Sequence, residues 1–600
     1  MPQFFRRVCT TRKSGWLFSC LFLCLLAPVS GVSQNILAIT HANVIDVTGG
    51  PTKRDYTVVI SGDRITEIGN SSKIPAPKSA EVLDATGKFL IPGLWDMHVH
   101  PHGKDYLPLF IANGVTGIRV MWGDPEDHEW RKAIEAGGLI GPRMIIASPL
   151  VDGPKPYWRG SISVSSEAEA RQVVIKAKQD GADFVKVYQF LPRDLYFAIA
   201  DEAKKQGMPF AGHVPISVSA QEASSAGQKS FEHLVGILPA CSSRSADLLK
   251  GQQDDLAEGL LSKPRYWGTH VVESRQMMLD TYRPDQVAAL CAVLKSNGTW
   301  QVPTLTLLRM FAYGDDPGFL KDTRLKYVPI RTRASWDPSA IDGKHTPEDF
   351  AYMKKEFQKD LEVVGAMQKA GVGILAGTDT ANPFCFPGFS LHDELGLLVQ
   401  AGLSPMEALQ AATLNPARFQ GKEKDLGTID KGKIADLILL DADPLDDIGN
   451  TKKIAAVVSA GRLYSRAALD QMLAKVEAVA NRKPIGDVLF KTIQEKDIDA
   501  AIKQYRELKS NQTAAYDFDE NEFIGLGYGL LHMKKFREAI EIFKLSVEAY
   551  PQSYNAYDSL GEAYMDNGDK ELAIKNDQKS LELNPGNANG VEKLRELRAQ

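Results

Sequence analysis

The middle of the chain, residues 93–423, alternates short apolar runs with longer segments of helical pattern. The apolar runs are LWDMHVH, GVTGIRVMW, RMIIASPL, ADFVKVY, PFAGHV, SFEHL, TWQVPTLTL and VGILAGTD. The segments between them include EAEARQVVIKAKQDG, with apolar residues at helical spacing and a closing glycine. Strands that alternate with helices indicate βαβ units and a parallel sheet. Eight such units close a (β/α)₈ barrel, so we predict an α/β protein with a TIM barrel.

Two flanking segments share a different pattern, in which short β-branched runs are broken by Gly, Asp and Asn. Residues 34–92 contain ILAITHANVIDV and YTVVISGDRITEI, and residues 424–466 contain KGKIADLILLDADP. Such runs are typical of strands joined by tight turns. We predict one small β-sandwich built from both flanks. Within the barrel segment, residues 314–347 are polar and contain Pro, and we expect them to extend over the barrel mouth.

The last part of the chain, residues 467–600, has a helical pattern only, and it contains a repeat. LGYGLLHMKKFREAIEIFKLSVEAYP begins at Leu526, and LGEAYMDNGDKELAIKNDQKSLELNP begins at Leu560, an offset of 34 residues. This is the tetratricopeptide period, with small residues at the helix crossing and a terminal Pro. A degenerate earlier copy starts at Ile498. We predict a helical linker followed by tetratricopeptide repeats.

Residues 1–33 have the pattern of a secretory signal peptide. Four basic residues precede the apolar run WLFSCLFLCLLAPV, and small residues follow in VSGVSQ. We expect cleavage between Gly31 and Ser33, and export to the periplasm or out of the cell. The alternative is an uncleaved membrane anchor, although the run is shorter than the roughly 20 residues that a spanning helix needs.

Composition excludes several classes of protein. The 75 acidic residues nearly balance 70 basic ones, so no long-range field would recruit nucleic acid or an anionic membrane. Three of the six cysteines lie in the predicted signal peptide, and Cys241, Cys291 and Cys385 remain. At most one disulfide is possible, which excludes a disulfide scaffold. Cys385 either lines a pocket near Asp379 or fills apolar space.

His98 and His100 end the first predicted barrel strand. Alternate side chains of a strand face the same way, so both imidazoles can point into one cavity. Such a pair also occurs by chance in sequences. The position of this pair favours a role as metal ligands, because the active sites of these barrels lie at the carboxyl ends of the strands.

Lys186 lies within ADFVKVY, between Val185 and Val187. A buried ammonium is costly, so burial should depress the pKa of this lysine. The neutral amine can then take up CO₂, and the two oxygens of the resulting carbamate could bridge two cations. The alternative is a lysine at a strand end whose ammonium reaches solvent.

His213, His233 and Asp379 each end a further strand-like run. A single histidine of this kind is more often structural than a ligand. Four histidines, one buried lysine and one aspartate at the ends of candidate barrel strands together indicate a metal centre. Imidazole nitrogens and carboxylate oxygens suit Zn²⁺, and other divalent ions also fit them.

The motifs GLWDMHVH, FVKVY, AGHV, FEHL and GTDT occur in this order, followed by FPGFSLHDELGLLVQAGLSPMEALQAATLNPARF and LGTIDKGKIADLILLDADPL. With them the chain resembles the amidohydrolase superfamily over residues 36–464. It is most similar to the branch of imidazolonepropionase-like proteins and metal-dependent prolidases and dipeptidases. The resemblance implies two divalent metal ions. Their ligands would be His98, His100 and Asp379 for the first ion, His213 and His233 for the second, and carbamylated Lys186 for both.

Such a centre implies hydrolysis of a C–N bond. Two cations that share a hydroxide keep a nucleophile available at neutral pH, and one of them polarises the scissile carbonyl. Asp379 would accept the proton of the hydroxide and return it to the leaving amine. Tyr188 is predicted to polarise the carbonyl, with a packing tyrosine as the alternative. His392 is predicted to support a ligand from the outer shell.

These motifs define the substrate less closely than they define the reaction. The dipeptidase-like relatives often carry Gly-Gly-His after the third strand, whereas this chain has PLVDGPKPYW from Pro149. No histidine is available there to hold a substrate, so dipeptidase specificity does not carry over directly. Arg119 either reaches a substrate carboxylate or forms an ion pair inside the barrel. We expect a small amide, dipeptide or cyclic amide as substrate.

Two other functions fit the sequence. The same dinuclear site also serves lactone and organophosphate hydrolysis in this superfamily. Alternatively, the barrel is a relic and the repeats act as a binding protein, although a relic has no reason to keep all six ligand types. We expect the repeats to present a concave helical surface to a peptide or partner protein. Dimerisation, or simple shielding of the barrel, is the alternative role of these helices.

Overall fold

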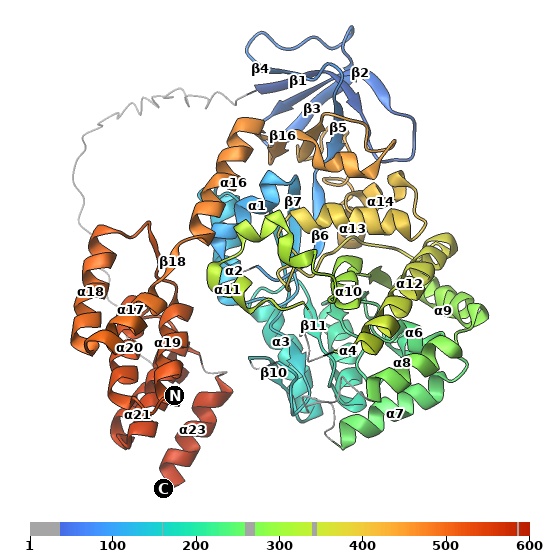
Figure 1. Cartoon of the computed structure of the whole chain (residues 1–600). Helices are drawn as coiled ribbons and strands as arrows, with labels where there is room; N and C mark the ends of the chain where they lie inside the picture. The colour runs from blue at the N-terminus through green and yellow to red at the C-terminus, as the bar shows by residue number, and fades with distance from the viewer. Residues whose placement is uncertain are drawn as a thin grey trace, which may run out of the picture.

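The computed structural model describes residues 36–101, 103–158, 160–258, 270–338, 345–584 and 587–599. The predicted signal peptide, residues 1–33, lies outside these ranges. Within them, no helix is both long and apolar enough to cross a membrane. Figure 1 shows three parts: a β-sheet, a mixed α/β unit and a mainly helical tail.

Strands from both flanks of the α/β unit join in one eight-stranded sheet. They are β1 (Ile36–Val44), β2 (Lys53–Ser61), β3 (Arg64–Asn70), β4 (Glu81–Asp84), β5 (Phe89–Pro92), β15 (Leu437–Leu440), β16 (Ile454–Ser459) and β17 (Arg462–Ser465). The order is β17-β16-β15-β5-β1-β2-β3, and β4 pairs with β1. The two flanks meet where β15 runs antiparallel to β5. Buried residues such as Ile39, Val58 and Leu439 give this sheet a core of its own.

The α/β unit is built on parallel strands. They are β6 (Leu94–Val99), β7 (Val115–Val120), β8 (Arg143–Ile146), β11 (Val185–Val187), β12 (Phe210–Gly212), β13 (Ser230–Glu232) and β14 (Trp300–Val302). Parallel bridges link Ala147 to Phe184, Gln301 to Ile374 and Val99 to Thr380. The segment 374–380 therefore joins β14 to β6, and eight parallel segments form a closed ring of hydrogen-bonded neighbours.

All eight predicted strand-like runs take part in this ring, but one of them ends early. TWQVPTLTL was predicted to be extended to Leu307, whereas β14 ends at Val302 and α10 (Leu305–Ala312) begins three residues later. The prediction was wrong there, because Pro303 has no N–H for the ladder and Thr304 takes a left-handed conformation, with φ 47°. Two short strands, β9 (Val151–Asp152) and β10 (Ile162–Ser163), extend the parallel pairing beside β11 and were not predicted.

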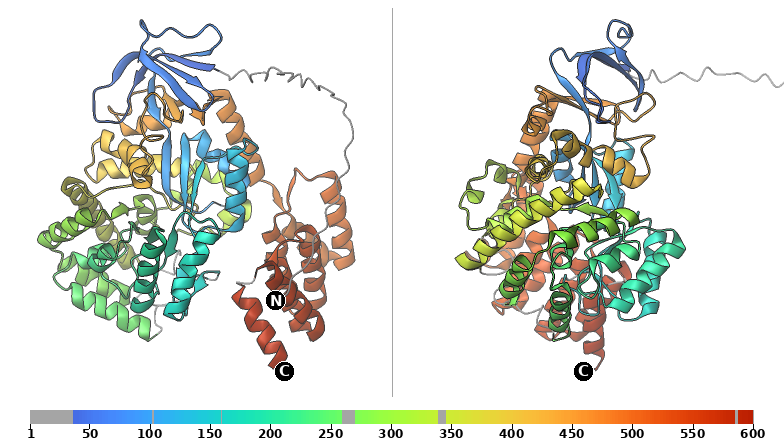
Figure 2. Two further views of the ribbon diagram at one scale, coloured as in Figure 1. Left: turned by 180° about the vertical axis from the view of Figure 1, so that it is seen from behind. Right: turned by 90° about the vertical axis from the view of Figure 1, so that its right-hand side faces the viewer.

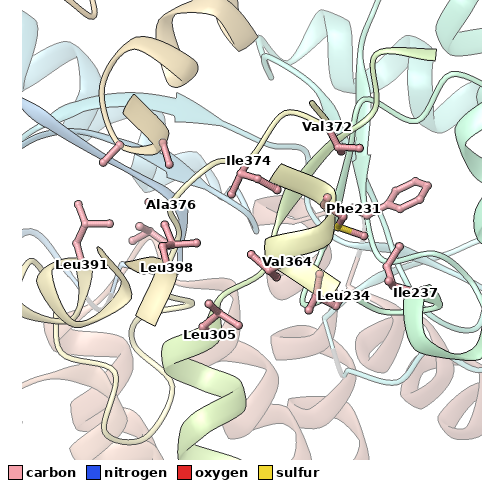
Figure 3. Packing of buried hydrophobic residues seen from close by; sticks show 14 of the residues in the cluster. Phe231, Leu234, Ile237, Leu305, Val364, Val372, Ile374, Ala376, Leu391 and Leu398 are labelled. Carbon is pink, nitrogen blue, oxygen red and sulfur yellow. The ribbon is translucent and has the colours of Figure 1, made fainter. Parts of the chain in front are cut away.

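Helices surround the ring (Figure 1). They include α1 (Leu107–Ala112), α2 (Pro125–Glu135), α3 (Glu167–Gln179), α4 (Arg193–Gln206), α5 (Ala220–Ser225), α6 (Ile237–Ala240), α7 (Ser245–Ala257), α8 (His270–Asp280), α9 (Pro284–Asn297), α12 (Pro347–Ala370), α13 (Phe389–Gln400), α14 (Pro405–Ala411) and α15 (Leu414–Gln420). The ends follow local chemistry: Ser166 caps α3 through its side chain, and left-handed Gly207 ends α4. Figure 3 shows apolar side chains of β13, α12 and α13, among them Phe231, Val364 and Leu398, packed into one core.

The tail consists of helices in antiparallel pairs (Figure 2). They are α17 (Ile485–Glu495), α18 (Ile498–Asn511), α19 (Glu520–His532), α20 (Phe536–Ala549), α21 (Tyr554–Asn567), α22 (Lys570–Leu583) and α23 (Ala588–Ala599). Two short strands, β18 (Lys483–Pro484) and β19 (Tyr516–Asp517), pair within the tail. The preceding helix, α16 (Arg466–Ala480), packs instead against α1, β16 and β17. Small residues allow the helices to approach closely. A Cβ on Gly527 of α19 would lie 2.4 Å from the ring of Phe543 on α20. The repeat pattern read from the sequence thus corresponds to helix pairs.

The polar stretch 314–347 links the α/β unit to the tail. It forms η3 (Phe319–Lys321), η4 (Thr323–Tyr327) and α11 (Ile330–Ser335). Arg331 of α11 donates to Glu522 at 2.7 Å and to Asp487 at 2.9 Å, both in the tail. Of this stretch, only His345 is among the described residues that line the main pocket. Val328 and Trp336 of this stretch pack against Leu307 and Phe384, next to residues that line the pocket, while α11 contacts the tail. The extension of this stretch over the pocket mouth stays a prediction.

Candidate metal centre and active-site pocket

The six predicted metal ligands come together in one pocket of about 860 Å³. His98 is the next-to-last residue of β6, His100 directly follows this strand, Lys186 is the middle of β11, and Asp379 lies in the segment after Ile374. His213 and His233 directly follow β12 and β13. Each therefore lies within or just beyond the carboxyl end of a parallel segment, which is why residues far apart in sequence meet at one edge of the ring.

Three of these side chains form a tight group. One ligand atom from each of His98, His100 and Asp379 lies within 4.8 Å of the others. Asp379 Oδ1 is 3.1 Å from His100 Nε2 and 3.4 Å from His98 Nε2. Gly377 allows this approach, because a Cβ there would lie 3.0 Å from the backbone nitrogen of His98.

His213 and His233 extend the group. His233 Nε2 is 3.7 Å from Asp379 Oδ2, and its ring centroid is 4.4 Å from that of His98. The rings of His213 and His233 are 4.9 Å apart. His213 and His233 therefore lie next to the group of His98, His100 and Asp379, and His233 contacts it directly.

Two of these residues have a strained backbone. His233 has φ 59° and Asp379 has φ 56°, left-handed values that non-glycine residues rarely adopt. At His233 this conformation ends β13 and turns the imidazole toward the side chain of His98. Strict alternation along the strand would have placed it on the face opposite Glu232.

Glu232 is a residue of this site that the sequence analysis missed. It is fully buried, and its Oε2 accepts a hydrogen bond from Nδ1 of His98 at 2.7 Å. Its Oε1 accepts from Arg119 at 2.7 Å and from Ser230 at 2.6 Å. Arg119 thus forms the ion pair inside the ring that was one of its two predicted roles. The FEHL motif contained the signal, since an acidic residue inside an apolar strand needs a buried partner.

A second chain of contacts supports His233. Its Nδ1 lies 2.7 Å from the hydroxyl of Thr304, directly before α10. Glu394 of α13 accepts from the backbone nitrogens of Leu305 and Thr306 at 3.0 and 2.8 Å, and so caps α10. Burial raises the pKa of Glu394 to about 8. The start of α10 is therefore fixed from one side by Glu394 and in turn fixes the imidazole.

Asp96 holds the two ligand-bearing segments together. It accepts from the backbone nitrogen of His98 at 3.3 Å, and from the nitrogen and hydroxyl of Thr378 at 3.0 and 2.6 Å. Burial raises the pKa of Asp96 to about 7 despite these hydrogen bonds. Because Thr378 precedes Asp379, this carboxyl sets the spacing of His98 and Asp379.

Lys186 is buried between Val185 and Val187. Burial lowers the pKa of its ammonium to about 8, although the charges of Glu232 and Asp379 oppose the change. The neutral amine is thus accessible near physiological pH, which is the form that reacts with CO₂.

Burial also lowers the pKa of three of the imidazoles. It takes the pKa of His98 and His213 well below their ordinary value and that of His233 to about 4. Burial alone would raise the pKa of Asp379, but the neighbouring His233, His100 and Lys186 outweigh it, and the pKa is lowered. These three histidines are therefore neutral and Asp379 is ionised, the forms that bind a metal.

The donor set fits a divalent cation. In the described part of the chain, His98 Nε2 and Asp379 Oδ1 are buried and have no hydrogen-bond partner. Buried polar atoms are almost always paired, so these two atoms face a ligand position. Imidazole nitrogens with carboxylate oxygens are the donors that Zn²⁺ and similar ions take.

Aromatic side chains form one wall of the pocket. Trp158, in the loop where the relatives often carry a histidine, donates from Nε1 to the hydroxyl of Tyr188 at 2.9 Å. The Tyr188 ring lies 4.2 Å from that of His213. Burial raises the pKa of the Tyr188 phenol, so it remains a hydrogen-bond donor. Tyr188 is therefore beside the metal ligands, as its predicted role requires.

His392 does not lie in this pocket, and its predicted outer-shell role was wrong. It is buried on α13, where Nε2 donates to the backbone oxygen of Asn113 and Nδ1 meets the hydroxyl of Thr451, both at 3.0 Å. Proximity to Asp379 in sequence was misleading, because α13 leads away from the ring edge. Cys385 is likewise buried among apolar residues outside the pocket, and all three described cysteines are free thiols.

Comparison with known proteins places this fold and site in a class. The model of the amidohydrolase family matches residues 89–464, more than half of the chain, so the chain belongs to the amidohydrolase family. The model of the tetratricopeptide repeat matches residues 554–587. Both findings confirm the resemblance read from the motifs, and the class is a mixed α/β amidohydrolase with a helical C-terminal region.

Particular relatives cover most of their own length. Ochratoxinase of Aspergillus niger is 24% identical over 507 residues, which is 73% of this chain and 88% of the relative. Imidazolonepropionase of Pseudomonas fluorescens is 22% identical over 424 residues, 68% of this chain and 93% of the relative. Among solved structures, a bottromycin amidohydrolase superposes with a TM-score of 0.59 and 22% identity, over 74% of this chain and 90% of its own.

Proposed function

We propose that this chain is a metal-dependent hydrolase that cleaves an amide-type C–N bond in a small substrate with a bulky apolar group. The observation that carries the proposal is the convergence of four histidines, Lys186 and Asp379 in one pocket. We also propose that the closed ring of eight parallel segments is a (β/α)₈ barrel, since its site lies at the carboxyl ends of the strands.

We propose that the site binds two metal ions, with Zn²⁺ as the first choice. His98, His100 and Asp379 would hold one ion, His213 and His233 the other, and Lys186 as a carbamate would bridge them. When bound, the ions would lower the pKa of water and polarise a carbonyl. His98 and His233 are held from behind by Glu232 and Thr304, so their Nε2 atoms keep a fixed direction.

Side chains of the protein carry out proton transfer, stabilise the developing charge and exclude water. Asp379 is ionised and lies among the ligands, so it takes the proton from the attacking water and returns it to the leaving amine. Tyr188 donates its hydroxyl hydrogen to the carbonyl oxygen, where charge develops. Buried apolar residues of the pocket, among them Leu150 and Leu234, exclude water around these groups and strengthen both interactions.

The pocket favours a larger substrate than a small dipeptide. Its volume of about 860 Å³ is that of a pocket for a drug-sized ligand, and most of its lining is apolar, including Trp122, Tyr157, Leu238 and Phe311. N-acylated amino acids, peptide-like amides and cyclic amides with aromatic or branched groups fit this lining. Lactones and organophosphates use the same kind of donor set, so they belong in the test.

The test is hydrolysis by purified protein of matched amide, cyclic amide, lactone and phosphotriester substrates that carry the same aromatic group. We expect amides to be hydrolysed, with two divalent ions per chain, and His98→Ala and His213→Ala to lower both metal content and rate. A protein with full activity after complete metal removal contradicts the proposal. Turnover of the lactone or phosphotriester alone would replace it with the alternative reaction class.

We further propose that the protein is exported and that the tail binds a peptide or protein. Export is supported by the pattern of residues 1–33, and binding by the tetratricopeptide helices of the tail. N-terminal sequencing of protein from the cell envelope tests the first proposal, with a start near Ser33 expected. Crosslinking of the isolated envelope fraction, with and without residues 483–600, tests the second. Capture of a second copy would instead indicate a homo-oligomer.

A further inference from the structure

One wall of the pocket is built from helices instead of strand ends, and it contains charged groups. We call it the helical wall. Its residues are Leu248 and Leu249 of α7, Arg275 and Met278 of α8, and Met353, Glu356, Phe357 and Asp360 of α12. Figure 1 shows α8 and α12 side by side next to α7. On α12 the lining residues recur at spacings of three and four, so one face of this helix is turned to the pocket.

The charges of the helical wall do not balance. Arg275 Nε is 2.7 Å from Glu356 Oε2, so the guanidinium neutralises one carboxylate. Asp360, four residues further on, is only 6% exposed, and no hydrogen bond or ion pair to it occurs within the described ranges. Burial, reinforced by the charge of Glu356, raises the pKa of Asp360 well above its ordinary value, and Arg275 only partly offsets this. The described part of the wall thus pairs Glu356 with Arg275 and leaves the buried acid of Asp360 without a cation.

We propose that Glu356 and Asp360 form a subsite for a cationic group, an ammonium or guanidinium, carried at the end of an apolar stem of the substrate. The inference rests on the proposed function, because the scissile bond is assigned to the metal centre of the same pocket. It names the class of substrate: an amide with a basic, long-chain substituent.

The residues around the subsite suit both the apolar stem and the cationic end of this ligand. Leu248, Met278 and Phe357 offer apolar contacts, which suit a methylene stem. A cation at the end of the stem would give Asp360 the partner it lacks and would complete two carboxylate–cation pairs. An anionic group would instead face Glu356, and Arg275 is already engaged by that carboxylate.

The first experiment compares substrates that differ only at the end of the stem. N-acyl derivatives and dipeptides of lysine, norleucine and glutamate share the reacting amide and most of the stem. Wild-type protein should prefer lysine over norleucine in kcat/KM by about 10- to 100-fold, the value of a hydrogen bond to a charged group. Asp360→Asn should reduce this ratio to about threefold or less. Glu362→Gln, on the same helix but 59% exposed, is the control and should keep the ratio.

The second experiment measures binding without turnover. Hexylammonium and hexanol are titrated calorimetrically into wild-type protein and into Asp360→Asn, with equal metal content checked in both. Since the metal centre is the same in the two proteins, a difference in affinity between them arises from the helical wall. We expect hexylammonium to bind the variant at least about tenfold more weakly, by the same estimate, and hexanol to bind both equally.

The outcomes separate the two proposals. Equal binding of hexylammonium to both proteins, or a lysine substrate with no advantage over norleucine, overturns the subsite. A preference for glutamate also overturns it, in favour of an anion site at Arg275. If no amide is hydrolysed but hexylammonium still distinguishes the two proteins, the subsite stands and the proposed function fails.

Discussion

Replacing Glu232 by Gln tests whether one buried carboxylate sets the protonation of a metal-binding imidazole. A carboxylate only accepts hydrogen bonds, so Nδ1 of His98 carries the proton and Nε2 has its lone pair free. In Glu232→Gln the amide oxygen keeps the hydrogen bonds from Arg119 and Ser230, and the amide nitrogen faces His98. Two donors then meet at Nδ1, and the imidazole must move its proton to Nε2.

Two magnitudes follow from the contacts of Glu232. Loss of an outer partner of a ligating histidine lowers metal affinity by about 10- to 100-fold. The change also leaves the buried Arg119 without a counter-charge, and breaking a buried pair costs about 3–5 kcal/mol. We expect the lower end, about 3 kcal/mol of unfolding free energy, because Arg119 keeps its hydrogen bonds to Met97 and Ser230.

Metal affinity is measured by competition with a coloured chelator, and stability by denaturant unfolding of the metal-free protein. The exposed Glu362→Gln, whose carboxylate pairs only with Lys359 in the described structure, is the control and should change neither quantity. Glu232→Gln with wild-type metal affinity would refute the reasoning, since it would show that His98 binds without its buried partner. A loss of stability with unchanged metal affinity would show that Glu232 stabilises the fold but does not support metal binding.

The remaining predictions concern single groups and the tail. Lys186→Ala should lose the second metal and activity together, keep its fold, and recover partly with short carboxylic acids and bicarbonate; a bare ammonium at Lys186 in a metal-loaded crystal would contradict this. Tyr188→Phe should lower kcat about 100-fold at unchanged metal content, as loss of an oxyanion donor does, and a wild-type kcat would make Tyr188 a packing residue. The pKa of His233 is about 4 in the folded state against 6.5 ordinarily, so the unfolded chain binds protons first. Metal-free protein should therefore lose stability as the pH falls from 6.5 toward 4, and denaturant titrations with a flat profile would contradict this. A chain that ends at Arg482 should keep its metal and its activity on small substrates, and loss of metal on truncation would show that the tail supports the ring.

The fold was largely predictable because buried parallel strands read as β-branched runs between helices. That pattern located all eight segments of the ring and both halves of the β-sheet. The same pattern predicted the ends of the helices and strands less well. Leu305 was assigned to a strand because its neighbours are apolar, while the absent N–H of Pro303 and the cap supplied by Glu394 start a helix there. The cap comes from a residue 89 positions away, which no local pattern contains.

The site was predictable only as far as period-two alternation applies. Four histidines, Lys186 and Asp379 were chosen because each ends a strand-like run, and the ring edge brings them together. Glu232 was missed because alternation places it opposite His233, and the left-handed backbone of His233 brings both side chains toward His98. His392 was chosen by sequence distance to Asp379, a criterion that fails here because His392 lies on α13, where it contacts Asn113 and Thr451 outside the pocket.

The same strained geometry bears on whether the ring is a working site or a relic that carries the repeats. His233, Thr304 and Asp379 each hold a left-handed conformation at a cost of about 1–3 kcal/mol. Within the described residues, His98 Nε2 and Asp379 Oδ1 are also buried without a hydrogen-bond partner, which costs about 1–3 kcal/mol for each atom unless a ligand binds it. A ring that served only as support would become more stable by replacing these groups with apolar ones, as buried polar clusters generally do. Thr304 shows the point most clearly: it is strained, and its hydroxyl contacts the nitrogen of His233 that faces away from Asp379. Its left-handed conformation makes the turn from β14 into α10 and also fixes the direction of His233 Nε2, which is the arrangement that a metal-binding imidazole needs.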